Sequence, residues 1–221
     1  MKIALLGKGK TGAEVLKLDP NVTVFDSKDK PKLESLSGHD IIISFLPGPV
    51  FSEYIQLLIE SKIPVITGST GFDWPKDIDK TLINNKLSWI YAHNFSLGMN
   101  IVKKMIETLS KATELFPDST FKIHEIHHTK KQDAPSGTAI SFEKWLGHKA
   151  EITSSRTGDV IGDHELTFEC DDEVITLNHS AKDRSIFARG ALWAAKIMNE
   201  DSNIPLGLNS FNDIVKNKLE L

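Results

Sequence analysis

Cysteine is nearly absent from this chain of 221 residues, because Cys170 is the single one. One thiol excludes an intrachain disulfide, and with it the small secreted domains that disulfides hold together. The sequence also lacks an apolar run of the roughly 20 residues that a membrane-spanning helix needs. The apolar run after Met1 and Lys2 is too short for a secretory signal. We therefore expect a cytoplasmic protein with no membrane partner.

A large excess of charge is also missing. The 26 basic and 30 acidic residues leave a net charge of −4, which offers no electrostatic footprint for a nucleic acid. Hydrophobic residues make up 40% of the chain, enough for a core, and the length fits one large domain or two small ones. The expected partners are small molecules, and no nucleic acid.

What the chain does have is a glycine-rich turn near its start. An apolar run over residues 2–6 leads into Gly7-Lys8-Gly9-Lys10-Thr11-Gly12, and residues 13–18 favour a helix. This is the G-x-G-x-x-G pattern between a strand and a helix. Its glycines allow a tight turn and let a pyrophosphate approach the N–H groups of the helix N-terminus. Alone the pattern is weak evidence, since Lys8 and Lys10 also fit solvated loop charges.

An acidic residue at the expected distance supports a dinucleotide site. Residues 21–25 predict a second strand, which ends at Asp26, nineteen residues after Gly7. A carboxylate there accepts hydrogen bonds from the ribose hydroxyls of a dinucleotide. An aspartate that only shapes a turn is the alternative. Ser27 and Lys28 follow directly and would accommodate a 2′-phosphate, so NADH and NADPH are both candidates.

Predicted strands and helices then alternate. Apolar runs over residues 41–46, 63–67 and 87–91 predict strands, and residues 50–60 and 76–84 predict helices. This alternation implies a parallel sheet whose ligands bind at the carboxyl ends of the strands. Two loops follow such strand ends, Gly68-Ser69-Thr70-Gly71 and Ala92-His93-Asn94-Phe95-Ser96.

The densest group of reactive side chains lies in residues 125–139, Glu-Ile-His-His-Thr-Lys-Lys-Gln-Asp-Ala-Pro-Ser-Gly-Thr-Ala. Histidine passes protons near neutral pH and lysine fixes anionic charge. A Gly-Thr pair at a helix start offers N–H groups and a hydroxyl to a carboxylate. Residues 121–126 predict a strand before this run, and residues 139–146 a helix capped by Ser136 or Thr138. We expect an active site at this strand end and helix N-terminus.

Residues 124–128 also satisfy the H-E-x-x-H pattern of zinc proteases. On a helix, residues four apart can share one metal ion. On a strand that rises about 3.3 Å per residue, His124 and His128 would lie roughly 13 Å apart. We therefore expect no metal site here.

Residues 125–139 resemble, nearly letter for letter, the E-x-H-H-x-x-K-x-D-A-P-S-G-T-A signature of the dihydrodipicolinate reductase family. The two loops after the strands are similar to its G-T-T-G and A-x-N-[FM]-S loops, and residues 179–192 to its H-x-A-x-x-R-x-x-F-A-x-G-A segment. The resemblance implies an α/β fold with a Rossmann-like parallel-sheet nucleotide domain, over residues 1–96 and 184–221. It implies a smaller α+β domain, over residues 97–183, that binds substrate and forms a homotetramer.

The resemblance further implies the chemistry. The family reduces dihydrodipicolinate in lysine biosynthesis through diaminopimelate, moving a hydride from C4 of NADH or NADPH to C4 of a conjugated cyclic imine with two carboxylates. His127 is then the acid/base group and Lys131 a second proton donor or charge stabiliser. His128, Gly137 and Thr138 would bind the substrate. The implied cofactor residues are Gly7, Lys8, Gly9, Lys10, Thr11, Gly12, Asp26, Gly68, Ser69, Thr70, Ala92, His93, Asn94 and Phe95.

The chain departs from the family pattern at two places. Lys10-Thr11-Gly12 stands where many relatives have Arg-Met-Gly, and the segment between Gly147 and Glu165 is short. The first departure concerns the pyrophosphate and substrate contacts, and the second concerns the oligomeric surface. Apart from these departures, two other functions stay open. One is a Rossmann dehydrogenase that acts on aspartate or another amino acid, and the other is a redox sensor that binds a nicotinamide cofactor without consuming it.

Overall fold

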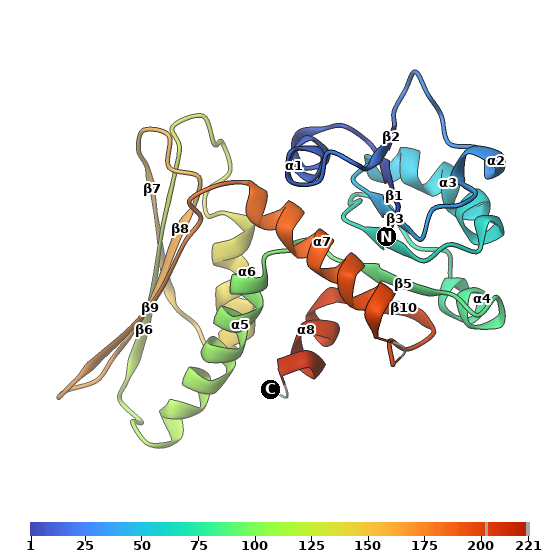
Figure 1. Cartoon of the computed structure of the whole chain (residues 1–221). Helices are drawn as coiled ribbons and strands as arrows, with labels where there is room; N and C mark the ends of the chain where they lie inside the picture. Colours follow the sequence, from blue (N-terminus) through green and yellow to red (C-terminus); the bar gives the residue numbers. More distant parts are fainter. Residues whose placement is uncertain (202, 220–221) are drawn as a thin grey trace. The chain divides into compact units, whose positions relative to one another are not determined.

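The computed structural model describes residues 1–201 and 203–219, and the chain divides into two compact units (Figure 1). The first unit combines Met1–Ser96 with Arg184–Leu221, and the second is Leu97–Asp183. Ser202, Glu220 and Leu221 belong to the nucleotide domain predicted over residues 184–221, but they lie outside the described residues.

The first unit is built on a six-stranded parallel sheet, which confirms the predicted Rossmann-like arrangement. The strand order is β10-β5-β4-β3-β1-β2. Every residue of β1, β3 and β4 is buried, as expected for a parallel sheet covered on both faces. The strands are β1 Ile3–Leu6, β2 Thr23–Phe25, β3 Ile41–Ser44, β4 Val65–Thr67, β5 Ser88–Tyr91 and β10 Gly207–Ser210.

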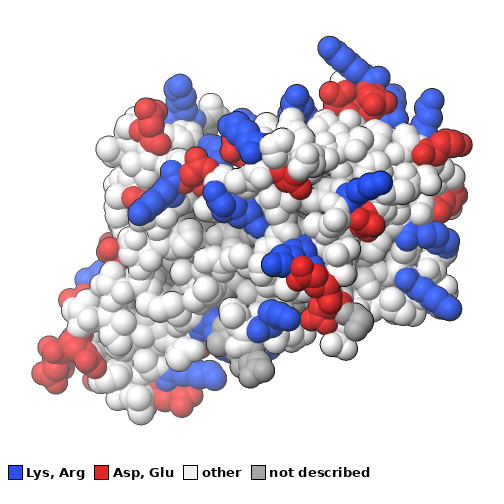
Figure 2. Space-filling view, viewed as in Figure 1, with Lys and Arg blue, Asp and Glu red and all other residues white. Residues whose placement is uncertain are grey.

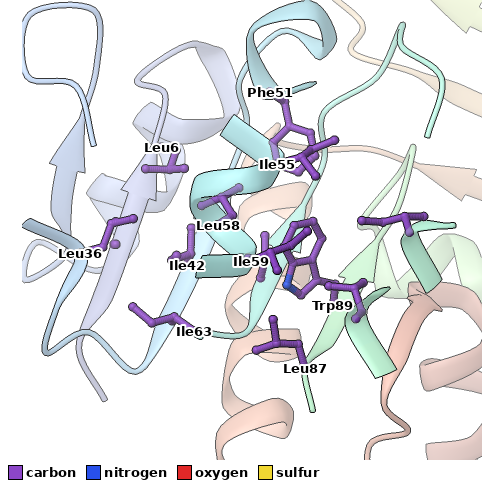
Figure 3. Packing of buried hydrophobic residues seen from close by; sticks show 14 of the residues in the cluster. Leu6, Leu36, Ile42, Phe51, Ile55, Leu58, Ile59, Ile63, Leu87 and Trp89 are labelled. Atoms are coloured by element: carbon purple, nitrogen blue, oxygen red, sulfur yellow. The ribbon is translucent and has the colours of Figure 1, made fainter. Parts of the chain in front are cut away.

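Helices cover both faces of this sheet. On one face α3 packs its apolar side into the core, and Figure 3 shows Leu58 beside Ile42. Full burial of a leucine side chain such as Leu58 contributes roughly 1.5–3 kcal/mol to folding. On the other face α7 contacts β3 and β4. The helices are α1 Lys10–Leu18, α2 Leu33–Leu36, α3 Gly48–Ser61, α4 Ile78–Asn84, α7 Ser185–Glu200 and α8 Phe211–Leu219.

The second unit is a four-stranded mixed sheet with two helices against one face, which confirms the predicted smaller α+β fold. The strand order is β7-β6-β8-β9, where β6 and β7 are parallel and the other pairs antiparallel. The strands are β6 Thr120–His127, β7 Glu151–Arg156, β8 Asp163–Glu169 and β9 Val174–Ser180. The helices are α5 Leu97–Leu109, a 3₁₀ helix Ser110–Glu114 and α6 Gly137–Leu146.

Side chains of alternate strand residues form the core of the second unit. Ile123 of β6 and Leu166 of β8 are fully buried, and they pack with Phe142 of α6. Because side chains alternate along a strand, the residues two and four positions beyond Ile123, Glu125 and His127, also point to this covered face. A strand that begins as core therefore ends by presenting ionisable groups.

Charge is distributed without a dominant sign on the face that Figure 2 shows, where basic and acidic side chains are interspersed. This agrees with the small net charge of −4. Among the described residues, no helix has both the length and the apolar character to cross a membrane.

Candidate active site

A cleft of about 730 Å³ lies in the first unit where the strands β1 to β4 end. Its position agrees with the rule that parallel sheets bind ligands beyond their carboxyl ends. Eight of the predicted cofactor residues line it, Gly7, Lys8, Gly9, Lys10, Thr11, Asp26, Gly68 and Thr70. Ser27, Phe45, Leu46 and Pro47 complete the lining.

The glycine turn needs its glycines for steric reasons. Gly7 has a φ of +93°, and a Cβ on Gly12 would lie 2.0 Å from the carbonyl oxygen of Gly7. Helix α1 begins directly after Gly9, three residues earlier than predicted, so its first N–H groups lie within the turn. A Cβ on Gly9 would meet no atom within 4 Å. The turn therefore fits a pyrophosphate, which needs open space beside free helix N–H groups.

Asp26 shapes its own turn in addition to lining the cleft. Its Oδ1 accepts hydrogen bonds from the N–H groups of Lys28, at 2.8 Å, and Asp29, at 3.2 Å. These bonds, the one from Lys28 first, lower the pKa of Asp26. The turn role that the sequence left open is therefore present, and an ionised carboxylate lines the cleft as well.

The other predicted cofactor residues, all within the described part of the chain, lie outside this lining. Gly12 is buried in α1, and Ser69 is buried with its hydroxyl 3.4 Å from that of Ser44. His93 is exposed, while Ala92 and Asn94 are partly buried. Phe95 is a core residue, 2% exposed, whose ring packs against Phe211 at a centroid distance of 4.8 Å.

In the second unit, a buried carboxylate lies beside the predicted acid/base histidine. Glu125 is fully buried, and its Oε2 is in ion-pair contact with Nδ1 of His127, whose side chain is 9% exposed. Oε1 of Glu125 lies 2.9 Å from the guanidinium of Arg156. Nε2 of His127 points away from the carboxylate and toward Gly162, where an added Cβ would lie 3.0 Å away. One imidazole nitrogen is thus held, and the other is the candidate for proton exchange.

The loop that carries Lys131 is tied to the same arginine. Arg156 donates hydrogen bonds to the backbone carbonyls of Lys131, at 3.3 Å, and of Asp133. The ammonium of Lys131 donates to both carboxylate oxygens of Asp133 at 2.8 Å, and this contact lowers the pKa of Asp133. A single side chain of β7 therefore contacts both the strand end and the loop.

The N-terminus of α6 is fixed by Ser136, the first of the two caps that the sequence suggested. Its hydroxyl oxygen accepts from the N–H of Ala139 at 3.2 Å and lies 3.1 Å from Nε2 of His164. Gly137 and Thr138 occupy the first turn of α6, where free N–H groups favour a carboxylate. His128, the third predicted substrate residue, is partly buried just beyond β6.

Burial sets the protonation of the three buried groups at this site. It lowers the pKa of His127, and the charge of Glu125 opposes that effect. Burial would raise the pKa of Glu125, but its polar and charged neighbours Ser154, Arg156 and His127 hold it below its usual value. Burial lowers the pKa of His164 to about 4. At neutral pH the site therefore contains an ionised Glu125 and a neutral His164.

The same three residues have the donor atoms of a metal site. One ligand atom each from Glu125, His127 and His164 lies within 4.8 Å of the others. The guanidinium of Arg156 already neutralises Glu125. The positive charge of Arg156 would therefore repel a metal cation bound at this place. The H-E-x-x-H pattern does not contribute, because β6 is a strand and His124 contacts Thr153 on the opposite face of the sheet.

The sequence interpretation missed three residues of this cluster. Glu125 stands in the recognised signature, and the alternation of buried residues along β6 was the signal that it faces His127. Arg156 and His164 gave no local signal, since they reach the site through strand pairing. His164 lies directly opposite Glu125 in the β6–β8 ladder, and Arg156 directly opposite His127 in the β6–β7 ladder.

Comparisons with known proteins show which family the chain resembles. Residues 98–214 match the family described as "Dihydrodipicolinate reductase, C-terminus". A protein of Thermosipho africanus named 4-hydroxy-tetrahydrodipicolinate reductase is 33% identical over 220 residues, 98% of each chain. A protein of the same name from Christiangramia forsetii is 31% identical over 98% of this chain and 100% of its own.

The fold is also found among solved structures. A dipicolinate-bound dihydrodipicolinate reductase from Paenisporosarcina sp. TG-14 superposes with a TM-score of 0.78 at 24% identity. The superposition covers 97% of this chain and 99% of that one. At this identity the likeness establishes a shared fold over the part of the chain that superposes.

Proposed function

The chain belongs to the dihydrodipicolinate reductase family, and on that premise we propose that it reduces 4-hydroxy-tetrahydrodipicolinate to tetrahydrodipicolinate with NADH or NADPH. The observation that carries the proposal is the short segment after β6: His127 ends that strand, Lys131 lies on the following loop and α6 begins at Gly137. Arg156 contacts both Glu125, beside His127, and the backbone of Lys131. That segment bears the proton-transfer and carboxylate-binding groups that a dianionic cyclic imine requires.

The reaction balances as follows. Loss of water from the 4-hydroxy compound gives a conjugated cyclic imine. A hydride from the nicotinamide forms a new C–H bond at ring C4, the conjugated electron pair shifts, and a ring carbon takes one proton. The net change consumes one NAD(P)H and one proton and releases NAD(P)⁺ and water. The protein must therefore supply a proton donor and bind two carboxylates.

Residues of the first unit would bind the cofactor. When bound, the reduced nicotinamide supplies the hydride. The open space at Gly9 and the free N–H groups of α1 suit its pyrophosphate, and Asp26 suits the adenosine ribose. We assign the remaining predicted residues, Gly68 to Thr70 and Ala92 to Phe95, to the nicotinamide side of this site.

Residues of the second unit would bind the substrate and provide the proton. His127 is the acid/base group, since Nε2 is the ring nitrogen that Glu125 does not contact. A bound dicarboxylate would favour the imidazolium by its negative charge. Lys131 is a second proton donor or charge stabiliser. His128 and the N–H groups at Gly137 and Thr138 bind the carboxylates.

The wider setting follows from the family. We propose that the product enters lysine biosynthesis through diaminopimelate, that the enzyme acts in the cytoplasm, and that the smaller unit, Leu97–Asp183, forms a homotetramer. Strand β9 supports an oligomeric role, because five of its seven residues are exposed in the single chain.

Absorbance at 340 nm tests the function directly. The heterocycle is generated in situ from pyruvate and aspartate semialdehyde with its synthase, and NADH and NADPH are supplied in turn. We expect oxidation of the cofactor that depends on both precursors. Oxidation that instead requires oxaloacetate and ammonia would identify an amino-acid dehydrogenase. Tight cofactor binding with no turnover on either substrate would identify a redox sensor.

A further inference from the structure

We propose that Glu125 and Arg156 are positioning residues for the reaction, with Glu125 fixing the imidazole of His127 and Arg156 locking both Glu125 and the Lys131 loop in place. The inference rests on the proposed function, because it takes His127 and Lys131 as the residues that act on the substrate. Neither positioning residue needs to contact the substrate.

The first step of the argument is the cost of burying Glu125. Its side chain is fully buried on the covered face of β6, in line with the core residue Ile123. Isolated ionised carboxylates in such places are strongly unfavourable. A residue that served only packing at this position would be apolar, as Ile123 is. The carboxylate therefore has a task that an apolar side chain cannot perform.

The second step is the geometry of that carboxylate. Each of its two oxygens meets one cationic or protonatable group, Oε2 the imidazole Nδ1 of His127 and Oε1 the guanidinium of Arg156. A carboxylate at Nδ1 selects the tautomer in which Nδ1 carries the proton, and it fixes the ring plane. Nε2 is then left without a proton, as the nitrogen that exchanges one.

The third step is the reach of Arg156. Besides Glu125, its guanidinium donates to the carbonyls of Lys131 and Asp133 and to that of Ser155. A planar fork with five N–H donors can make all these contacts at once, whereas a lysine ammonium cannot. Arg156 thus couples the position of the imidazole to the position of the loop that carries Lys131.

The charged and titratable groups around His127 come from four elements. Glu125 lies on its own strand, Arg156 on β7, His164 on β8 and Lys131 on the following loop. Of these, only Glu125 brings negative charge to the imidazole, and it opposes the lowering of the pKa of His127 by burial. Removal of that charge should therefore lower the pKa of His127 further.

The variant Glu125→Gln keeps the shape and removes the charge. We would label the wild type and the variant with ¹⁵N-histidine, assign the His127 ring signals by their loss in His127→Gln, and titrate both proteins. We expect the pKa of His127 to be lower in the variant by about one unit or more. We also expect the neutral ring of the variant to lose its preference for the tautomer with the proton on Nδ1. We expect kcat to fall by about tenfold to about 10⁴-fold, with NADH affinity unchanged.

Matched controls lie on the same sheet. Glu165→Gln makes the same change one strand away, at a residue that follows His164 and so points to the opposite face. Lys122→Gln changes a residue of β6 itself and breaks its exposed ion pair with Glu169 of β8. Both controls should keep wild-type kcat within about twofold, since exposed pairs contribute little, and should leave the His127 titration unchanged.

Arg156→Lys tests the second half of the proposal. The charge remains near Glu125, so the His127 titration should stay close to that of the wild type. The loop contacts are lost, so kcat should fall by about tenfold or more. Wild-type kcat in Arg156→Lys would show that Arg156 is not a positioning residue. If thermal melting shows that Glu125→Gln does not fold, the kcat of Arg156→Lys is the result that tests the proposal.

The two readouts separate this inference from the proposed function. An unchanged His127 titration together with near-normal kcat in Glu125→Gln would overturn the inference while the reductase activity stands. A wild type that does not reduce the heterocycle, with a His127 titration that still shifts in Glu125→Gln, would refute the function and leave the coupling of the two side chains intact.

Discussion

Gly162 lies against the Nε2 edge of the His127 ring, so closely that a Cβ on it would be 3.0 Å from Nε2. The same added atom would lie 3.4 Å from the ring of His164. A side chain at residue 162 would therefore press on the nitrogen that Glu125 leaves free. The absence of a side chain at residue 162 therefore leaves the His127 ring in place without a steric clash at Nε2.

The Gly162→Ala variant should reduce turnover without unfolding the protein. The added methyl forces the His127 ring to shift by a few tenths of an ångström, and small misplacements of a catalytic group lower rates steeply. We expect kcat to fall by up to about tenfold, with unchanged NADH affinity, because the cofactor cleft lies in the other unit. Steady-state kinetics and a fluorescence titration with NADH measure the two effects. Wild-type kcat would show that His127 does not act through Nε2.

Two glycines of the cofactor turn should respond in opposite ways to alanine. In Gly12→Ala the new Cβ would lie 2.0 Å from the carbonyl of Gly7, so we expect a loss of stability of about 1–3 kcal/mol. In Gly9→Ala the new Cβ meets nothing within 4 Å, so stability should change by no more than about 0.5 kcal/mol.

The affinity for NADH should nevertheless fall by about tenfold or more in Gly9→Ala, or about 1.4 kcal/mol, because the methyl occupies the space proposed for the pyrophosphate. Urea unfolding and NADH titration of both variants provide the comparison. Wild-type affinity in Gly9→Ala would place the pyrophosphate elsewhere.

His164 should make the protein less stable in mild acid. Its pKa is about 4 in the folded protein against 6.5 for an unperturbed histidine, so the unfolded chain binds the proton more tightly. The stabilising contribution is complete above about pH 6.5 and is lost as the pH falls toward 4. Its full size is about 3 kcal/mol. Urea unfolding midpoints measured between pH 7.5 and 4.5 follow this loss.

The variant His164→Asn isolates that contribution. Burial also lowers the pKa values of His127 and His179, and those histidines contribute to the acid loss in both proteins. The wild type should therefore lose more stability than His164→Asn over the same pH range, so the difference between the two curves should change by about 3 kcal/mol between neutral pH and pH 4. Parallel curves would mean that the pKa of His164 is the same in the folded and unfolded chain, and would contradict the prediction.

The sequence predicted most of the elements because their signals are local. The apolar runs over residues 41–46 and 87–91 became β3 and β5, and the predicted helix over residues 139–146 became α6, beginning at Gly137. The sequence placed the start of α1 three residues too late, because Gly9 at its N-cap and Lys10 at its first position are not apolar and so do not extend the helical pattern of apolar residues. Patterns of three to ten residues determine such elements, and they can be read without knowledge of the fold.

The rest of the site depends on pairing between distant residues. Strand β7 was not predicted, since Glu151–Arg156 is short, polar and half exposed, and Arg156 was missed with it. Arg156 meets Glu125 only because β7 pairs with β6. The two strands are parallel, and α6 connects them. His164 reaches His127 only through the antiparallel β6–β8 register. No local pattern encodes such a register, so the sequence identified the acid/base and lysine candidates but not the residues that hold them.

The measurement that tests the central claim most directly is kcat for His127→Gln and Lys131→Ala on the heterocycle, with the Kd for NADH measured on the same preparations. Lys130→Ala, a change at the exposed neighbouring lysine, is the matched control and should keep near wild-type kcat. We predict that kcat falls by about 10²-fold or more in both site variants, while the Kd for NADH stays within about twofold of the wild type. Near-normal turnover in both site variants would contradict the account.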